Sequence, residues 1–319
     1  MKCLCCAKDI KETASPQEME WGWHRQCVRK FFGTPRMPII ELTTQALEQL
    51  AGNAVSRGLT VPGVQRKLSL HLSQEKEARL TLVDYPTGYI LKPQTPEYDH
   101  LPEYEQMAMT MADSLGIQTV PHALIHMNKT YAYITRRVDR NITNTHTELF
   151  AMEDFCQLSG RLTADKYKGS YENCGKIVSR YSAFEGFDLS ELYLRIVGSF
   201  IMGNSDMHLK NFSLIEESSG SRVFKLSPAY DLLPVNVILP SDKDQMALTV
   251  NGKKRNIRRK DFLELADKIS LNKTAATRIL MRVVKSRDTL LKICDDSLLS
   301  PQDKIKVHAL IQTRCEILK

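Results

Sequence analysis

The chain has 319 residues, a formal net charge of +7 and 42% hydrophobic residues. This composition excludes an intrinsically disordered chain, and the length allows two domains or lobes. No apolar run reaches the roughly 18 residues of a membrane-spanning helix, and the first residues, MKCLCCAK, lack the apolar core of a secretory signal. We therefore expect a cytoplasmic protein with no membrane partner, whose cysteines are reduced thiols or metal ligands. The mild positive charge favours acidic partners without establishing nucleic-acid binding.

The first 40 residues, expected to form a separate segment (1–40), carry two pairs of side chains with the spacing of metal ligands. Cys3 and Cys6 are separated by two residues, and so are His24 and Cys27. Two such pairs can close a tetrahedral Zn²⁺ site of three thiolates and one imidazole. A bound ion would stabilise a segment that is too short for much core of its own. Cys5 could replace Cys3 or Cys6, and the alternative is a set of unrelated thiols.

Residues 50–140 read as a lobe that begins with a small antiparallel sheet. The segment 60–72 starts as a polar loop and ends as an alternating strand, and the segments 80–83 and 88–93 continue as strands. Lys92 lies on the third of these strands. A lysine at this place could contact the α- and β-phosphates of ATP, whereas the alternative is an ordinary solvent-facing lysine.

A helix follows over 103–115, because the segment is rich in helix formers and ends at Gly116. Glu105 is the residue of this helix that we expect to pair with Lys92, as a helix glutamate pairs with the strand lysine in protein kinases.

Two further strands, over 120–125 and 130–135, lead to Arg136, Arg137 and Val138. These residues stand where a kinase has the hinge between its lobes. Adenine recognition at a hinge uses backbone N–H and C=O groups, so side-chain identity matters little there.

Residues 141–319 are expected to form the second lobe, and they hold the most informative motif. An apolar run over 194–203 precedes Asp206-Met-His-Leu-Lys-Asn211, and two short strands and a polar connection then lead to Asp231. Asp-x4-Asn is the spacing of the kinase catalytic loop, in which the aspartate accepts the proton of the attacking hydroxyl and the asparagine binds Mg²⁺. Asp231 stands where the second metal-binding aspartate belongs. Alternatively, Asp and Asn simply cap turns here.

The remaining C-terminal segment is mainly helical in its pattern. A helix begins near Asp188, a hairpin is expected around the Asn251-Gly252 pair, and helices are expected over 260–269, 273–295 and 302–318. The run KKRNIRRK over 253–260 is the densest cluster of charge. It either holds tRNA, an aminoacyl-tRNA synthetase or DNA bound through another protein, or forms a solvated face. The expected fold class is therefore α+β, with a protein-kinase-like two-lobed fold and a mainly helical C-lobe.

Several short motifs, taken in this order, resemble the HipA family, the bacterial serine/threonine kinases that act as toxins of type II toxin–antitoxin systems. The motifs are Gly63-x-Gln65-x-Lys67, Ile90-x-Lys92-Pro93, Arg137-Val138-Asp139-Arg140, Glu153-Asp154-Phe155-Cys156-Gln157, Asn204 to Ser213 and Pro228-x-Tyr230-Asp231. The resemblance runs from about residue 50 to the C-terminus. Because the larger N-terminal subdomain of the long HipA form is missing, the chain is most similar to short, HipT-like toxins.

The resemblance implies a role for each matching position. It makes Asp206 the catalytic base and Asn211 and Asp231 the Mg²⁺ ligands. The implied ATP contacts are Pro62, Gly63, Val64, Gln65 and Lys67 in a loop that covers the nucleotide, together with Lys92, His208, Lys210 and Tyr230. In the family, a Ser or Thr just before the glycine of this loop is autophosphorylated, which ejects the loop and silences the kinase. Thr60, or else Ser56, would be that residue here.

The implied activity is that of a protein serine/threonine kinase (EC 2.7.11.1-type) that uses ATP and Mg²⁺. Its implied substrate is a translation component such as an aminoacyl-tRNA synthetase, whose phosphorylation arrests growth. The implied partners are a HipB-like DNA-binding antitoxin and a small HipS-like protein, so that DNA is contacted only through the antitoxin. Two alternatives stay open: a small-molecule or lipid kinase of similar fold, and a non-catalytic binding module stabilised by zinc.

Overall fold

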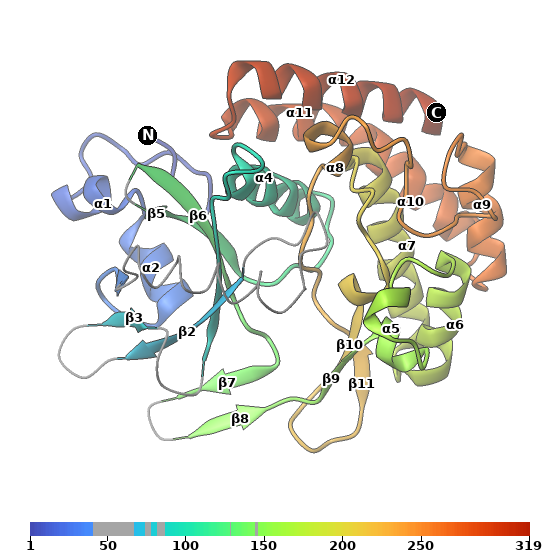
Figure 1. Cartoon of the computed structure of the whole chain (residues 1–319), viewed down its shortest axis with the longest axis horizontal. Coiled ribbons are helices and arrows are strands. Elements are labelled where there is room, and N and C mark those ends of the chain that lie inside the picture. The colour runs from blue at the N-terminus through green and yellow to red at the C-terminus, as the bar shows by residue number, and fades with distance from the viewer. Residues whose placement is uncertain (41–66, 74–77, 82–86, 128, 144–145) are drawn as a thin grey trace. The chain divides into compact units, whose positions relative to one another are not determined.

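The structure is a computed structural model that describes residues 1–40, 67–73, 78–81, 87–127, 129–143 and 146–319 (Figure 1). The described chain divides into two compact units. The first unit comprises residues 1–106 and 121–147, and the second comprises residues 107–120 and 148–319. Predicted site residues that lie outside the described residues are Ser56, Thr60, Pro62, Gly63, Val64 and Gln65. No described helix has both the length and the apolar character that a membrane span needs.

The first unit is built on a six-stranded sheet with the strand order β1-β3-β2-β4-β6-β5 (Figure 1). Its strands are β1 (Ile39–Ile40), β2 (Leu68–Ser73), β3 (Arg79–Thr81), β4 (Tyr89–Pro93), β5 (His122–Met127) and β6 (Thr130–Arg136). All neighbours are antiparallel except β1 and β3, which pair in parallel. The predicted antiparallel sheet is therefore present. Its third predicted strand is β4, where Lys92 lies opposite Tyr133 of β6.

The N-terminal segment of this unit contains two short helices with clear start and stop signals. Helix α1 (Pro16–Trp21) begins with a capping box between Ser15 and Glu18, and α2 (Arg25–Phe32) ends at Gly33. Trp23 is fully buried between them and contacts the rings of Phe31 and Phe32. The segment thus has an aromatic core in the same compact unit as the sheet, although the sequence suggested little core of its own.

Helix α4 (Leu101–Ser114) confirms the predicted helix, although it begins two residues earlier than expected. Gly116 follows its last turn with a φ of +81°, a left-handed conformation that glycine adopts without steric cost. A two-stranded sheet consists of β7 (Arg140–Ile142) and β8 (Thr147–Leu149).

The second unit begins with a three-stranded sheet and the helices that follow it. Strands β9 (Met152–Asp154), β10 (Ser213–Glu216) and β11 (Phe224–Leu226) are antiparallel in the order β11-β10-β9. The strands β10 and β11 are the predicted hairpin, and β9 was not predicted. The helices of this part are α5 (Phe155–Leu158), the 3₁₀ turn η1 (Thr163–Asp165), α6 (Tyr171–Tyr181), α7 (Glu185–Met202) and the 3₁₀ turn η2 (Leu209–Asn211).

Helix α7 is the central helix of the second unit and confirms the predicted apolar run, but it starts at Glu185 rather than at Asp188. It packs against α6, α10 and α12. The helices beyond it are α8 (Val235–Ile238), α9 (Arg259–Lys268), α10 (Lys273–Lys285), α11 (Arg287–Asp296) and α12 (Pro301–Leu318) (Figure 1).

Two predictions for this region were wrong in detail. The continuous helix over 273–295 is two helices, α10 and α11, because Ser286 caps the end of α10 and the chain then starts a new turn. The turn at Asn251 and Gly252 is present, with both residues at positive φ, but its flanks form a single bridge between Val250 and Lys253 and not a hairpin of two strands.

Candidate functional site

The Asp206–Asn211 motif forms a compact polar loop between α7 and β10. Helix α7 ends at Gly203 in the left-handed conformation, φ +74°, which turns the chain sharply into the loop. The side-chain oxygen of Asn204 accepts a hydrogen bond from the backbone N–H of Asp206 (3.2 Å). Asn211 then donates from Nδ2 to the backbone carbonyl of Asp206 (3.0 Å), so Oδ1 is the atom of its carboxamide that remains for a ligand.

Tyr167 is a member of this site that the sequence did not indicate. It follows η1, and its hydroxyl donates a hydrogen bond of 2.6 Å to Oδ1 of Asp206, while its ring meets that of His208 edge-on at 5.0 Å between centroids. Burial raises the pKa of the Tyr167 hydroxyl, and the hydrogen bond and charge of Asp206 and the charges of Asp242 and Asp231 raise it further. Three carboxylates therefore act on one hydroxyl, an accumulation of negative charge that suits a divalent cation.

Asp231 adopts a left-handed backbone conformation, φ +61°, which costs a non-glycine residue about 1 to 2 kcal/mol. Backbone strain of this kind gathers at functional sites, where the surroundings hold the residue in place. The segment before Asp231 is held by Ala229, whose N–H donates to the carbonyl of Gln118 (2.7 Å) and whose carbonyl accepts from Val120 (3.0 Å).

A buried ion pair on α7 supports the same segment. Arg195 is 1% exposed and donates from Nη2 to the backbone carbonyl of Ser227 (2.6 Å), and its Nε pairs with Glu191 at 3.1 Å. A central helix therefore fixes the entry to the Asp231 loop. Neither residue stood out in the sequence, because a charged residue in an apolar helix shows its partners only in the folded chain.

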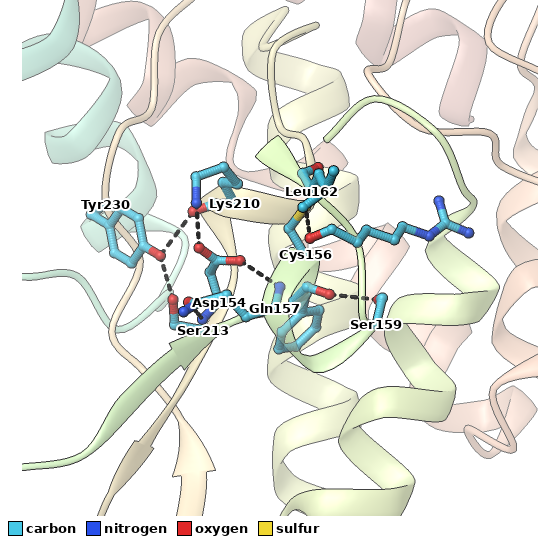
Figure 2. Close-up of polar contacts among 10 residues, drawn as sticks. Asp154, Cys156, Gln157, Ser159, Leu162, Lys210, Ser213 and Tyr230 are labelled. Atoms are coloured by element: carbon cyan, nitrogen blue, oxygen red, sulfur yellow. Dashed lines mark hydrogen bonds and ion pairs between the residues drawn. The ribbon is translucent and has the colours of Figure 1, made fainter. Parts of the chain in front are cut away.

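Lys210 and Tyr230 come together around Asp154, as Figure 2 shows. Nζ of Lys210 pairs with Oδ2 of Asp154 at 2.6 Å, while the hydroxyl of Tyr230 donates to the carbonyl of Lys210 (3.1 Å) and lies 2.6 Å from Oγ of Ser213. Asp154 also accepts from the backbone N–H of Gln157 and so caps α5. This network joins β9, η2, β10 and the Asp231 loop within the second unit.

Lys92 and Glu105 form a buried ion pair in the first unit, as predicted. The side chains are 4% and 0% exposed, and Nζ of Lys92 bonds directly to Oε1 of Glu105. Nζ of Lys92 also lies 5.3 Å from the centroid of the Tyr133 ring. A buried cation is tolerated only with such partners, so the predicted solvent-facing alternative for Lys92 is wrong.

Asp139 accepts hydrogen bonds from two arginines of the expected hinge region. Its carboxylate accepts two hydrogen bonds from Arg137 (2.9 and 2.6 Å) and two from Arg140 (3.3 and 2.8 Å). Burial alone would raise the pKa of Asp139, but these bonds and the two positive charges lower it to about 2.

The backbone of the expected hinge is partly engaged within the first unit. The N–H groups of Arg136 and Arg137 donate to the carbonyls of Pro121 (3.0 Å) and Gly88 (2.9 Å). Of the three predicted hinge residues, this leaves Val138 as the candidate N–H donor to adenine. Lys67, the described end of the predicted nucleotide-covering loop, is exposed just before β2.

The four predicted metal ligands Cys3, Cys6, His24 and Cys27 gather in one cluster. Their ligand atoms all lie within 4.8 Å of one another. Nδ1 of His24 is 3.4 Å from Sγ of Cys6 and 3.9 Å from Sγ of Cys27. Cys5 is not a member of this set, which favours Cys3 and Cys6 over Cys5 as ligands.

Several basic side chains of the run over 253–260 form ion pairs or hydrogen bonds within the second unit. Lys253 pairs with the buried Asp261 at 2.7 Å and Arg255 pairs with Asp244 at 2.6 Å. Arg259 donates to the backbone carbonyl of Leu318 (2.6 Å). These contacts favour a structural role for a large part of the charge cluster.

The chain is similar to proteins that are described as kinases. It is 26% identical over 274 residues to a Haemophilus influenzae protein with the name "Putative kinase", covering 78% of each chain. It is 33% identical over 204 residues to "Putative kinase Y4dM" and 29% identical over 206 residues to "Putative kinase Y4mE", both of Sinorhizobium fredii. These two alignments cover 59% and 63% of the chain, and the chain spans only about half the length of each of these two relatives (47% and 48%).

Two solved structures share the fold. HipA of Shewanella oneidensis, solved in a complex with HipB and operator DNA, superposes with a TM-score of 0.68 at 20% identity over 81% of this chain and 64% of that one. The Helicobacter pylori proinflammatory kinase CtkA superposes with a TM-score of 0.52 at 17% identity over 76% of this chain and 88% of that one. These similarities confirm the predicted α+β, kinase-like fold class.

The family itself is settled by a match along the sequence. The model of the HipA-like C-terminal domain matches residues 59–290, which hold the Lys92–Glu105 pair, the Asp206–Asn211 loop and Asp231. Because this match spans more than half of the chain, the protein belongs to the family that carries the HipA-like C-terminal domain.

Proposed function

We propose that the protein is an ATP-dependent protein serine/threonine kinase. The observation that carries the proposal is the site around Tyr167, whose hydroxyl donates to Asp206 and whose pKa is raised by the charges of Asp206, Asp242 and Asp231, with the carboxamide of Asn211 bonded to the same loop. The match to the HipA-like C-terminal domain family supports it, as does the fold shared with a kinase, CtkA.

In the proposed reaction, the hydroxyl oxygen of a serine or threonine bonds to the γ-phosphorus of ATP, the bond from that phosphorus to the bridging oxygen breaks, and ADP leaves. Asp206 accepts the hydroxyl proton. Oδ1 of Asn211 and the carboxylate of Asp231 are the groups that would hold Mg²⁺, which when bound offsets phosphate charge. Lys92, oriented by Glu105, is the proposed phosphate-binding lysine.

We further propose a toxin role, with an aminoacyl-tRNA synthetase as the class of substrate and an antitoxin as partner. The support is the family and the similarity to Shewanella HipA, which was solved with HipB and operator DNA. This chain covers 64% of that protein, so the arrangement of the partner is part of the proposal. We propose a HipB-like antitoxin or a small HipS-like protein as the partner, and the cytoplasm as the location.

Self-inhibition by phosphorylation of Thr60, or of Ser56, completes the proposal. Both residues precede Gly63, in the loop that is expected to cover the nucleotide. A phosphate adds nearly two negative charges, which would repel the phosphates of ATP. Peptide mass spectrometry after incubation with ATP tests this part: phosphate at neither residue in the active enzyme would remove the self-inhibition while leaving the kinase assignment in place.

The central test is phosphate transfer from labelled ATP to proteins of a bacterial lysate. Asp206→Asn keeps the shape of the side chain but removes the base, so the rate should fall at least about 100-fold. Asp231→Asn should also abolish transfer. Asp267→Asn, the same change at an exposed position of α9, is the matched control and should leave the rate unchanged.

Two outcomes decide between the proposals. Activity of Asp206→Asn above roughly a tenth of wild type would exclude Asp206 as the base. If label appears only in small molecules or lipids and not in protein, the protein-kinase proposal is wrong and the small-molecule or lipid kinase alternative is supported. Identification of the labelled proteins then tests the proposed synthetase substrate.

A further inference from the structure

We propose that Cys3, Cys6, His24 and Cys27 bind one structural Zn²⁺ ion, and that this ion stabilises the sheet that carries Lys92. Zn–S bonds of about 2.3 Å and Zn–N bonds of about 2.0 Å place neighbouring ligand atoms of a tetrahedral site about 3.4 to 3.8 Å apart. The distances from Nδ1 of His24 to the thiol sulfurs of Cys6 and Cys27, 3.4 and 3.9 Å, agree with that spacing. Three thiolates and one imidazole form a closed set with no position left for a reacting water, which is the pattern of structural rather than catalytic zinc.

The hydrogen bond of the second ring nitrogen of His24 is consistent with metal binding at Nδ1. Nε2 lies 3.2 Å from the backbone carbonyl of Asp9, and a carbonyl can only accept, so Nε2 carries the proton. A metal would then bind Nδ1, which is the atom that faces Cys6 and Cys27. A backbone carbonyl that fixes the tautomer in this way is the usual outer partner of a metal-binding histidine.

The segment with the cluster closes one edge of the sheet. Strand β5 is the last strand in the order, so one side of its backbone has no strand partner among the described residues. The N-terminal segment supplies hydrogen-bond partners to Leu124 of β5. The N–H of Leu124 donates to the carbonyl of Leu4 (2.9 Å), and its carbonyl accepts from Nε1 of Trp23 (2.9 Å). Leu4 follows one ligand, Cys3, and Trp23 precedes another, His24, so the ion would hold both protecting groups in place.

Helix α2 also connects the metal cluster to strand β4 through packing contacts. Cys27 is a residue of α2, and Phe31 and Phe32 of that helix lie against Tyr89, with ring centroids 6.0 and 5.4 Å apart. The hydroxyl of Tyr89 donates to the carbonyl of Phe31 (3.3 Å). Tyr89 begins β4, the strand of Lys92. Loss of the ion should therefore loosen β4 and β5 as well as the first 33 residues, because the binding free energy of a structural ion is folding free energy.

The test uses the full chain, purified without chelator, and its variants Cys6→Ser and Cys5→Ser. Cys5 neighbours Cys6 but lies outside the cluster, so it is the matched control. Elemental analysis should give about one zinc per chain for wild type and Cys5→Ser, as one four-ligand site requires, and far less for Cys6→Ser. Replacement with Co²⁺ should give the visible absorption bands of a tetrahedral thiolate site. The melting temperature should fall by at least about 5 °C in Cys6→Ser and remain near wild type in Cys5→Ser.

If Cys6→Ser does not fold, chelation of the wild-type protein provides the second measurement. Release of zinc should increase amide hydrogen exchange at Leu124 and along β4 and β5. Wild-type protein without zinc that also fails to take up Co²⁺ would overturn the metal site, and so would equal metal loss in the two serine variants. Increased exchange confined to the first 33 residues would overturn the coupling to the sheet. None of these readouts depends on kinase activity, so they remain distinct from the test of the proposed function.

Discussion

The hydroxyl of Tyr167 donates a 2.6 Å hydrogen bond to Oδ1 of Asp206, although 39 positions separate the two residues in the chain. Tyr167 therefore acts as a positioning residue for the proposed base. We expect Tyr167→Phe to lower kcat about tenfold, the scale of one hydrogen bond to a charged group, and to leave the KM for ATP within about twofold. Steady-state phosphorylation assays measure both constants.

Tyr181→Phe, at an exposed position of α6, is the control and should leave both constants unchanged. The pKa of Tyr167 is raised, so the hydroxyl keeps its proton, and its hydrogen bond, through at least about pH 10, the ordinary pKa of tyrosine. The ratio of wild-type to Tyr167→Phe activity should then be constant between neutral pH and that limit. A kcat for Tyr167→Phe equal to wild type would show that Asp206 does not need this contact.

The buried pair of Lys92 and Glu105 predicts a specific pattern in a double-mutant cycle. Lys92→Met and Glu105→Leu should each lower the free energy of unfolding by about 3 to 5 kcal/mol, because each leaves one buried charge without its partner. The double variant should recover most of this loss, since an apolar pair of similar volume replaces two desolvated charges. Denaturant unfolding gives the stabilities.

Phosphorylation assays on the same variants separate stability from function. Every variant without Lys92 should be inactive, including the stable double variant, if Lys92 contacts the phosphates. A double variant as unstable as the sum of the single losses would contradict the ion-pair explanation, and an active double variant would remove Lys92 from the proposed site.

The positive φ of Asp231 predicts a difference in stability between two variants that both lack its carboxylate. Asp231→Gly should be more stable than Asp231→Ala by about 1 kcal/mol, because glycine adopts φ +61° without the steric cost of a Cβ atom. Both should lack phosphate transfer. Thermal unfolding compares the two, and an alanine variant as stable as the glycine variant would show that the loop relaxes away from this conformation.

Asp139 predicts a dependence of stability on pH. Its pKa is lowered to about 2 in the folded chain, so its contribution is fully present above the ordinary value of about 4 and is lost as pH falls through the folded value. Asp139→Asn should cost about 1 to 2 kcal/mol near pH 7, after allowance for partial solvent exposure.

The difference between wild type and Asp139→Asn should narrow as pH falls from about 5 towards 3, which denaturant unfolding at each pH measures. Asp288→Asn breaks an exposed pair with Arg287 and is the control, with little expected effect at any pH. A difference that stays constant across this range would mean that Asp139 does not stabilise the fold through its charge.

The chemistry of the candidate site could be predicted from the sequence because it depends on short spacings and residue types. Asp206 and Asn211 lie five positions apart in one loop. The two residues of each Cys/His pair lie on a single turn, so local geometry brings the ligand atoms within each pair together. The pairing of Lys92 with Glu105 was also predicted, because a strand lysine followed by a helix glutamate is the order in which protein kinases form this pair. The roles in ATP and Mg²⁺ binding stay predictions.

Contacts between distant segments were decided by the tertiary structure alone. Neither helical or strand periodicity nor a short sequence spacing predicts these contacts. They are the contacts of Tyr167 with Asp206, the effect of the Asp242 carboxylate on Tyr167, the Asp154–Lys210 pair and the hydrogen bond from Arg195 to Ser227. The break at Ser286 and the exclusion of Cys5 from the cluster have the same origin. Local patterns specify which side chains a turn or helix presents, whereas packing of the whole unit decides which of them meet, because a buried polar group must find its partner wherever the fold provides one.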